Sequence, residues 1–192
     1  MDYSQILSQQ FNIKEEYAKN IITLLDDGNT IPFIARYRKE MHGSMDDQLI
    51  REFAEKLEYL RGLDKRRDEI RSLIDAQEKL TDEINLALDK AATLSELEDI
   101  YRPYRPKRKT RASIAKEKGL EPLANDILKQ EKGFDPSKSA VDYIDEEKGV
   151  TSVEDAIQGA MDIIAELVSD NAEIRKRIRN LTNANGVLVS VA

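Results

Sequence analysis

The sequence predicts an all-α protein in which long helices pack together. Apolar side chains recur at spacings of three and four residues through most of the chain, as they do along the buried face of a helix. Glycine, asparagine and proline interrupt this pattern at intervals, and only the short run 187–191 resembles a strand. With 192 residues and 40% hydrophobic content, the chain is long enough to bury the core of one domain or of two small ones.

The first 29 residues predict two helices and a turn, similar to a helix-turn-helix arrangement. Apolar residues with helical spacing lie within 6–11 and 17–25, and Asp27, Gly28 and Asn29 end the second helix. Pro32 follows in an apolar segment, and we expect it to hold Ile31 in an extended conformation.

A long helix is predicted over 46–78, with Ser44 as its N-cap. Its apolar stripe thins over 64–69, and Gly62 favours a kink over a clean break. Cations alternate with carboxylates along this helix, which predicts a solvated and ion-paired face. These cations are Arg61, Lys65, Arg66, Arg67 and Arg71. Shorter helices are expected to begin near Thr81 and near Thr93.

Beyond residue 100 the helical pattern is lost and then regained. Two prolines predict a mostly extended path over 101–106, helices are expected at 113–118 and 120–130, and 133–139 has the composition of a turn.

The last helix has the clearest pattern, a heptad-like seam over 153–181 that is about 30 residues long. Thr151 and Glu154 form its predicted capping box, and Asn183 to Gly186 end it. Asn171, in the middle, either fixes the register of a helical pair or faces solvent. We expect this helix to lie along the 46–78 helix. The run 187–191 is expected to be a strand whose partners lie beyond the last residue of a truncated chain.

The composition argues against several classes of function. The chain has no cysteine, which excludes disulfides, thiolate metal sites and a cysteine nucleophile. The single histidine, His42, is interpreted as a turn residue, and the sequence contains neither a glycine-rich phosphate loop nor a catalytic carboxylate pattern. No segment is apolar enough to span a membrane, and the start lacks a signal-peptide pattern. We therefore expect a cytoplasmic protein that is not an enzyme and that holds no metal or cofactor.

Positive charge is concentrated in one short segment. Residues 101–118 carry 8 basic and 1 acidic side chains, whereas 1–100 carry 14 and 22 and 119–192 carry 8 and 14. Cations that neutralise phosphates, interleaved with tyrosines on which bases stack, are typical of surfaces that bind single-stranded nucleic acid. The alternative is a stiff connector whose arginines pair with the acidic helices on either side, and the charge of the flanking blocks favours it. The candidate residues are Tyr101, Arg102, Tyr104, Arg105, Lys107, Arg108, Lys109 and Arg111.

A smaller basic cluster follows the Gly28 turn. Arg36, Arg38 and Lys39 flank Tyr37, and helix-turn-helix proteins can present such side chains to a DNA backbone. Ordinary helix packing explains the same segment equally well.

Two segments of the chain are distinctive: GNTIPFIARYRKEMHGSMDD (28–47) and LEDIYRPYRPKRKTRASIAKEKGLEPLA (97–124). Both resemble the amino-terminal region of the Tex family, bacterial transcription accessory proteins that are similar to a eukaryotic transcription elongation factor. The order of the remaining helices is also similar, so the resemblance covers nearly the whole chain.

The resemblance implies an elongated helical scaffold over 1–186, with 187–192 beginning a resolvase-like domain. In the family, this ribonuclease-H-type domain, a helix-hairpin-helix domain and an OB-fold RNA-binding domain follow, and we expect this region to contact them. The implied function is a non-catalytic module that helps to bind RNA, DNA or the transcription machinery. The alternative is a protein-interaction scaffold that leaves nucleic-acid binding to the later domains. By position, the resemblance marks Arg36, Arg38 and the segment 101–111, and it implies a catalytic role for none of them.

Overall fold

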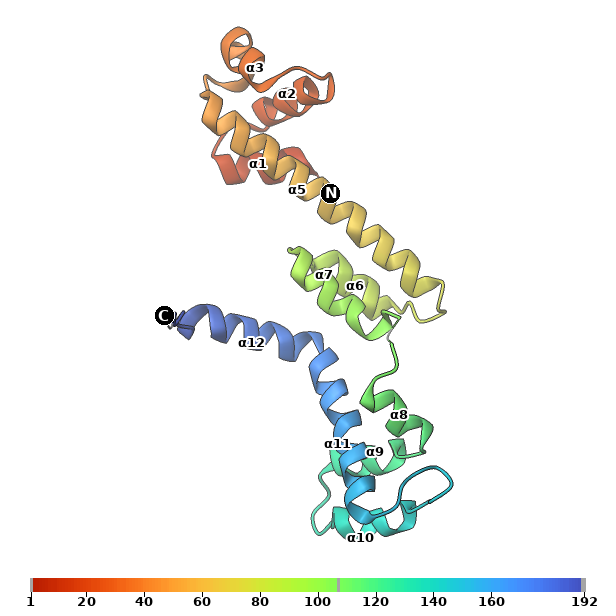
Figure 1. Ribbon diagram of the computed structural model, residues 1–192. Helices are drawn as coiled ribbons and strands as arrows, with labels where there is room; N and C mark the ends of the chain where they lie inside the picture. Colours follow the sequence, from red (N-terminus) through yellow and green to blue (C-terminus); the bar gives the residue numbers. More distant parts are fainter. Residues whose placement is uncertain (1, 107, 191–192) are drawn as a thin grey trace. The chain divides into compact units, whose positions relative to one another are not determined.

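The computed structural model describes residues 2–106 and 108–190, and its regular elements are helical (Figure 1). Within these ranges the one strand-like pairing is an isolated bridge between Asp145 and Val150. The chain forms two compact units, 1–94 and 95–192. Over the same described ranges, every helix is too short or too polar to cross a membrane. The all-α prediction is confirmed.

The described part of the first unit is a series of helices on either side of one long helix. They are α1 (Tyr3–Phe11), α2 (Glu15–Asp26), α3 (Ile31–Tyr37), α4 (Lys39–His42), α5 (Asp47–Asp75) and α6 (Asp82–Lys90). Asp2 caps α1 by accepting hydrogen bonds from the backbone N–H groups of Ser4 and Gln5, and Asn12 ends α1 in the left-handed conformation. The two opening helices and the turn at Gly28 are therefore confirmed.

The core of the first unit forms where α1, α2 and α3 pack on the first half of α5. Each of these helices contributes apolar side chains that are spaced three or four residues apart, and burying them is the main stabilising term. The largest fully buried side chains of this core are Leu7, Ile21, Ile34, Ile50 and Phe53.

Pro32 is the second residue of a helix, contrary to the expectation of an extended segment. It lies in the first turn of α3, where a missing N–H group removes no intrahelical hydrogen bond. The extended residue is Thr30, one position earlier than the predicted Ile31. The Ile-Pro-Phe-Ile segment therefore adds a helix to the core, and that helix carries the basic residues that follow it.

The predicted N-cap of the long helix is also wrong. Asp46 caps α5 by accepting from the N–H of Leu49 at 2.8 Å, whereas Ser44 lies in the preceding turn with a φ of 62°. The helix itself is confirmed, and its 29 residues pass through Gly62 without a break.

His42 is a core residue rather than the turn residue that we expected. It is the last residue of α4, and its side chain is fully buried. Its Nε2 lies 3.1 Å from the carbonyl oxygen of Ile34, which can only accept, so Nε2–H donates. His42 thereby joins α4 to α3, the two short helices that hold the basic cluster at 36–39.

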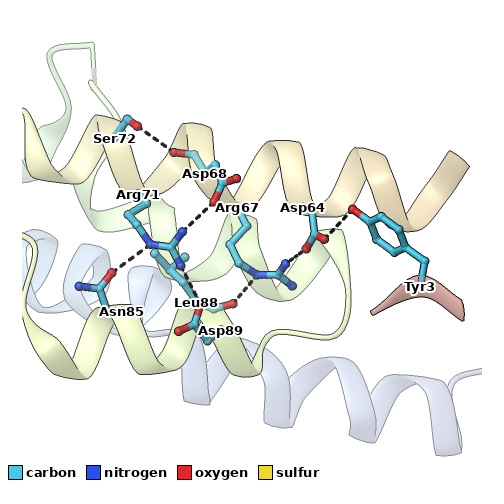
Figure 2. A network of polar contacts seen from close by, with 9 residues as sticks. All are labelled: Tyr3, Asp64, Arg67, Asp68, Arg71, Ser72, Asn85, Leu88 and Asp89. Carbon is cyan, nitrogen blue, oxygen red and sulfur yellow. Dashed lines mark hydrogen bonds and ion pairs between the residues drawn. The ribbon is translucent and has the colours of Figure 1, made fainter. Parts of the chain in front are cut away.

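Arg67 joins α5 to α6 from inside the unit, which contradicts the expectation of a solvated cation (Figure 2). Its guanidinium donates to the carbonyl oxygens of Leu88 at 2.9 Å and Ala91 at 3.0 Å, and it also pairs with Asp64. These carbonyls lie at the C-terminal end of α6, where the last carbonyl groups of a helix lack the regular N–H donors from the following turn. Arg67 therefore satisfies the last turn of α6 and fixes that helix on α5.

The polar network around Arg67 extends along the same faces of α5 and α6 (Figure 2). Asp64 also accepts from the hydroxyl of Tyr3 on α1 at 2.8 Å. One turn further along α5, Arg71 donates to Asn85 at 3.1 Å and to Asp89 at 2.7 Å on α6. The network therefore links α1, α5 and α6, and the ion pairing expected along this helix is confirmed.

We predict that Arg67→Ala lowers the free energy of unfolding of the first unit by about 3–5 kcal/mol, because it leaves a carboxylate and two carbonyls without their buried donor. Arg51→Ala, on the same helix, is the matched control. The exposed pair between Arg51 and Asp47 is worth less than about 1 kcal/mol. Urea denaturation followed by circular dichroism measures both variants. Equal losses would contradict the role given to Arg67.

The described part of the second unit packs several short helices around one longer one. Its elements are α7 (Leu94–Tyr101, which begins at the unit boundary), the 3₁₀ turn η1 (Arg102–Tyr104), α8 (Arg111–Glu117), α9 (Glu121–Lys129), α10 (Pro136–Ala140), the 3₁₀ turn η2 (Val141–Tyr143), α11 (Val153–Asp170) and α12 (Ala172–Asn185). The helices expected near 93, at 113–118 and at 120–130 are confirmed. Part of the expected turn at 133–139 is instead helix α10.

The core of the second unit forms where α11 packs on α8, α9 and α10. Small residues allow this close approach, and Ala156, Ala160 and Ala115 are all buried. Gly159 on α11 faces the side chain of Leu120 so closely that a Cβ atom at this position would overlap it. The buried stripe of α11 thus has partners within its own unit. Packing of the last helix along the 46–78 helix stays a prediction.

The predicted 30-residue terminal helix is two helices. Asn171 separates α11 from α12 with an extended backbone (φ −72°, ψ 116°), and its side chain caps α12 by accepting from the N–H of Ile174 at 3.0 Å. Asn171 is exposed, as in the solvent-facing alternative, but it lies between two helices and acts as an N-cap, a role that we did not predict. The cap of α11 is Ser152, which accepts from the N–H of Asp155, rather than the predicted Thr151 with Glu154.

The described end of the chain, residues 186–190, has no regular secondary structure. The side chains of Val187, Leu188 and Val189 are at least 80% exposed. Val191 lies outside the described residues. A strand in this run and the division at residue 187 both stay predictions.

Two mid-helix glycines predict opposite responses to alanine. Gly62 has open space around its Cα, so Gly62→Ala should stabilise the protein by up to about 1 kcal/mol through helix propensity. A Cβ at Gly159 would overlap Leu120 and lie 3.3 Å from the Cβ of Ala115, so Gly159→Ala should destabilise by about 1–3 kcal/mol. Thermal unfolding of both variants checks the signs, and stabilisation by Gly159→Ala would contradict the close packing of α11.

Candidate nucleic-acid interface

The candidate residues form two separate surfaces, one on each unit. The α3–α4 patch consists of Arg36, Tyr37, Arg38 and Lys39 on the first unit. The basic segment consists of residues 101–111 on the second unit. They differ in how much of their positive charge is already neutralised by the protein itself.

The basic segment begins as helix, which corrects the predicted extended path for its first residues. Tyr101 is the buried last residue of α7, and η1 follows directly. Pro103 fits the first turn of η1 because no N–H donor is needed there. The backbone becomes extended only at Arg105, and Thr110 then starts α8 with a capping box.

Carboxylates from neighbouring helices pair with four of the described cations in the basic segment. The pairs are Arg102–Asp170 (2.8 Å), Arg105–Glu98, Lys109–Glu117 (3.1 Å) and Arg111–Asp162 (3.7 Å). The hydroxyl of Thr110 also donates to Glu166 on α11 at 3.0 Å. These contacts are the internal ion pairing that the flanking acidic charge favoured. Lys107, the remaining lysine of the segment, lies outside the described residues.

The basic segment also lines an open groove of about 430 Å³ against α11. The lining side chains are Arg102, Arg105, Arg108, Thr110, Glu166, Ser169 and Asp170. A phosphate that entered this groove would meet three guanidinium groups but also two carboxylates. Because these carboxylates compete for the same cations, the groove is a weaker phosphate site than its arginine content suggests.

The α3–α4 patch is more open. All four of its residues are exposed, and Tyr37 is 64% exposed. Its ring centroid lies 5.3 Å from that of Phe33, and the guanidinium of Arg38 lies 5.4 Å from the Phe33 centroid. In the described part of the chain, no carboxylate pairs with Arg36, Arg38 or Lys39. The three cations are therefore available to an outside anion.

The chemistry available to the α3–α4 patch is phosphate contact and base stacking. Three unpaired cations within four residues can each neutralise a phosphate, and an exposed tyrosine offers a face to an unstacked base. Helix α3 has seven residues and α4 has four, which is short for a recognition helix that reads a major groove. The arrangement therefore favours backbone and stacking contacts over base-edge readout.

Sequence reasoning missed a buried ion cluster in the second unit. Asp99, whose side chain is 6% exposed, accepts from Arg175 at 2.6 Å and from Arg179, both on α12. Burial by itself would raise the pKa of Asp99, but hydrogen bonds and charge from Arg179 and Arg175 outweigh it and lower the pKa below its usual value. The spacing of four between the arginines predicts a shared partner, but the sequence does not say which carboxylate it is.

No group of three or more His, Asp or Glu side chains is positioned to hold a metal ion in the part of the chain that the structure describes.

Two families match parts of the chain, and relatives align along nearly all of it. Residues 1–75 match the Tex-like protein N-terminal domain, and residues 131–192 match the Tex central region-like family. Relatives include protein tex of Bordetella pertussis (42% identical over 99% of this chain), transcriptional accessory protein Tex of Neisseria gonorrhoeae (41% over 94%) and S1 RNA-binding domain-containing protein 1 of Homo sapiens (33% over 98%). The chain spans 24%, 23% and 19% of the lengths of these three proteins, respectively.

Proposed function

We propose, from the premise that this chain belongs to the Tex family, that it is a non-catalytic helical module of a transcription accessory protein and contacts nucleic acid through the α3–α4 patch. One relative is named a transcriptional accessory protein, and another is named for an S1 RNA-binding domain. A role of this kind makes RNA or DNA and the transcription machinery its partners and places the chain in the cytoplasm.

The observation that carries the proposal is the difference in pairing between the two basic surfaces. Arg36, Arg38 and Lys39 stand without carboxylate partners in the described chain, whereas the cations of the basic segment are largely paired. An unpaired cation gains a counter-charge when it binds phosphate, whereas a paired cation must first give one up. The α3–α4 patch is therefore the stronger phosphate-binding surface.

A scaffold role is the second candidate, and the basic segment favours it. Arg102 and Thr110 contact α11, and Arg105 contacts α7, so the segment fastens the two helices on either side of it. In this alternative the segment braces the second unit and nucleic acid binds elsewhere in the longer family members.

We predict that replacing Arg36, Arg38 and Lys39 together by Ser weakens nucleic-acid binding and flattens its salt dependence. Three lost phosphate contacts reduce the slope of log K against log salt by about 2 for single strands and about 3 for duplex. Fluorescence anisotropy with labelled single-stranded RNA, single-stranded DNA and duplex DNA, each titrated at several salt concentrations, measures the slope.

Two control variants locate the surface. Replacing Lys19, Arg51 and Lys129 by Ser removes the same charge from cations that are each paired with a carboxylate three or four residues away, and should change the slope little. Replacing Arg102, Arg105 and Arg108 by Ser tests the groove. If only the groove variant loses nucleic-acid binding, the interface lies on the second unit instead. If the unchanged chain binds no nucleic acid at about 100 μM, the scaffold role is the one supported.

A further inference from the structure

Helix α12 is attached to its unit without burying a single side chain. Its larger apolar residues lie on one face, at Ile174, Ile178 and Leu181, and are 37%, 58% and 63% exposed. By contrast, α11 buries three side chains of the unit's core, including Ile163. Hydrophobic burial, which holds most helices in place, therefore contributes little to the position of α12.

Ion pairs hold a polar side of α12, next to its apolar face, on α7. Asp99 accepts hydrogen bonds from Nε of Arg175 and from Arg179, and Nζ of Lys176 lies 3.0 Å from Glu96. We call these five residues the Asp99 clamp. Both carboxylates belong to one helical turn of α7, and all three cations belong to adjacent turns of α12. The attachment of α12 is thus electrostatic and confined to one short stretch.

A single residue sets the direction in which α12 leaves α11. Asn171 is the one non-helical residue between them, and its side chain caps α12 through the N–H of Ile174. Because this cap is local, the start of α12 stays satisfied whatever the angle between the helices. One further contact crosses the hinge, from Nη1 of Arg175 to the carbonyl oxygen of Ser169 at 3.3 Å, and it uses the same guanidinium as the ion pair with Asp99. A change in the backbone dihedral angles of one residue is enough to swing a helix of 14 residues, about 21 Å long.

We propose that α12 is a hinged arm that pivots at Asn171. The Asp99 clamp holds this arm in place until a competing anion binds Arg175 and Arg179. The side chains of Arg175 and Arg179 remain 34% and 32% exposed, so a phosphate-bearing polyanion can reach both. Release leaves the α8–α11 core folded and frees two guanidinium groups beside the apolar face. The released α12 opens more often, because a lone helix of 14 residues is only marginally stable in water.

The arm is tested by a distance measurement across the hinge. Met161 on α11 and Asn180 on α12 are both exposed, and the chain has no cysteine, so Met161→Cys and Asn180→Cys place two spin labels at unique positions. Double electron–electron resonance should give a narrow distance distribution for this pair in low salt. Adding Asp99→Asn should broaden the distribution, and so should sodium tripolyphosphate at constant ionic strength.

Asp126→Asn is the matched control, because it removes the same charge from an exposed ion pair on α9 and should leave the distribution narrow. Hydrogen exchange then separates release from unfolding. In Asp99→Asn we expect amides of 172–185 to exchange at least about tenfold faster while those of α11 keep their protection. Arg175→Gln with Arg179→Gln should behave in the same way and leaves Asp99 in place.

Two outcomes would overturn the hinged arm. A distribution that stays narrow in both Asp99→Asn and the arginine double variant would show that other contacts hold α12. Loss of protection throughout α8, α9 and α11 would show that the clamp supports the whole unit. A distribution that broadens in the variants but not with tripolyphosphate would overturn the release by anions.

Discussion

Guanidinium groups tie the outer helices of each unit to its apolar core. Both cores are small: one gathers where α1 to α3 meet the first half of α5, and the other gathers around α11. Helices α6 and α12 lie outside these two core clusters. Arg67 adds hydrogen bonds to the burial of Leu88 on α6, whereas Arg175 and Arg179 hold α12, which buries no side chain. A buried or half-buried cation is tolerated only with partners that satisfy its donors, so each joint also fixes which carboxylate or carbonyl lies opposite it.

This use of arginine decides where positive charge is available for function. The most basic stretch of the sequence supplies several of these joints, and Arg102 and Arg105 meet Asp170 and Glu98. The weaker sequence signal, at 36–39, retains its charge because α3 and α4 are short and present these residues to solvent. Local composition thus pointed to the basic segment as the stronger phosphate-binding surface, whereas the pairing of the side chains points to the α3–α4 patch. The number of cations in a segment is a poor measure of its affinity for phosphate when those cations are already paired with carboxylates of the same chain.

The parts of the fold that could be predicted are those set by local spacing. The stripe of α5 and the start of α6 at Thr81 depend on residues a few positions apart, and the sequence contains all that they need. Periodicity could not reveal the break at Asn171, because a cap changes the direction of the chain without changing the apolar spacing around it. The burial of His42 and Arg67 depends on partners at Ile34 and Leu88, which no local pattern specifies. For the same reason, the sequence supplied the candidate cations but not which of them are free.

The two kinds of arginine joint differ in a way that separates permanent from releasable attachment. Arg67 is nearly inaccessible, and two of its acceptors are backbone carbonyls, so neither solvent ions nor a ligand can exchange for them. Arg175 and Arg179 are about one-third exposed and share one carboxylate that another anion can replace, and Arg175 also donates to the carbonyl oxygen of Ser169. The same side-chain chemistry therefore makes α6 a fixed part of the first unit and α12 a movable part of the second. Exposure of the guanidinium, rather than the number of its hydrogen bonds, is what distinguishes them.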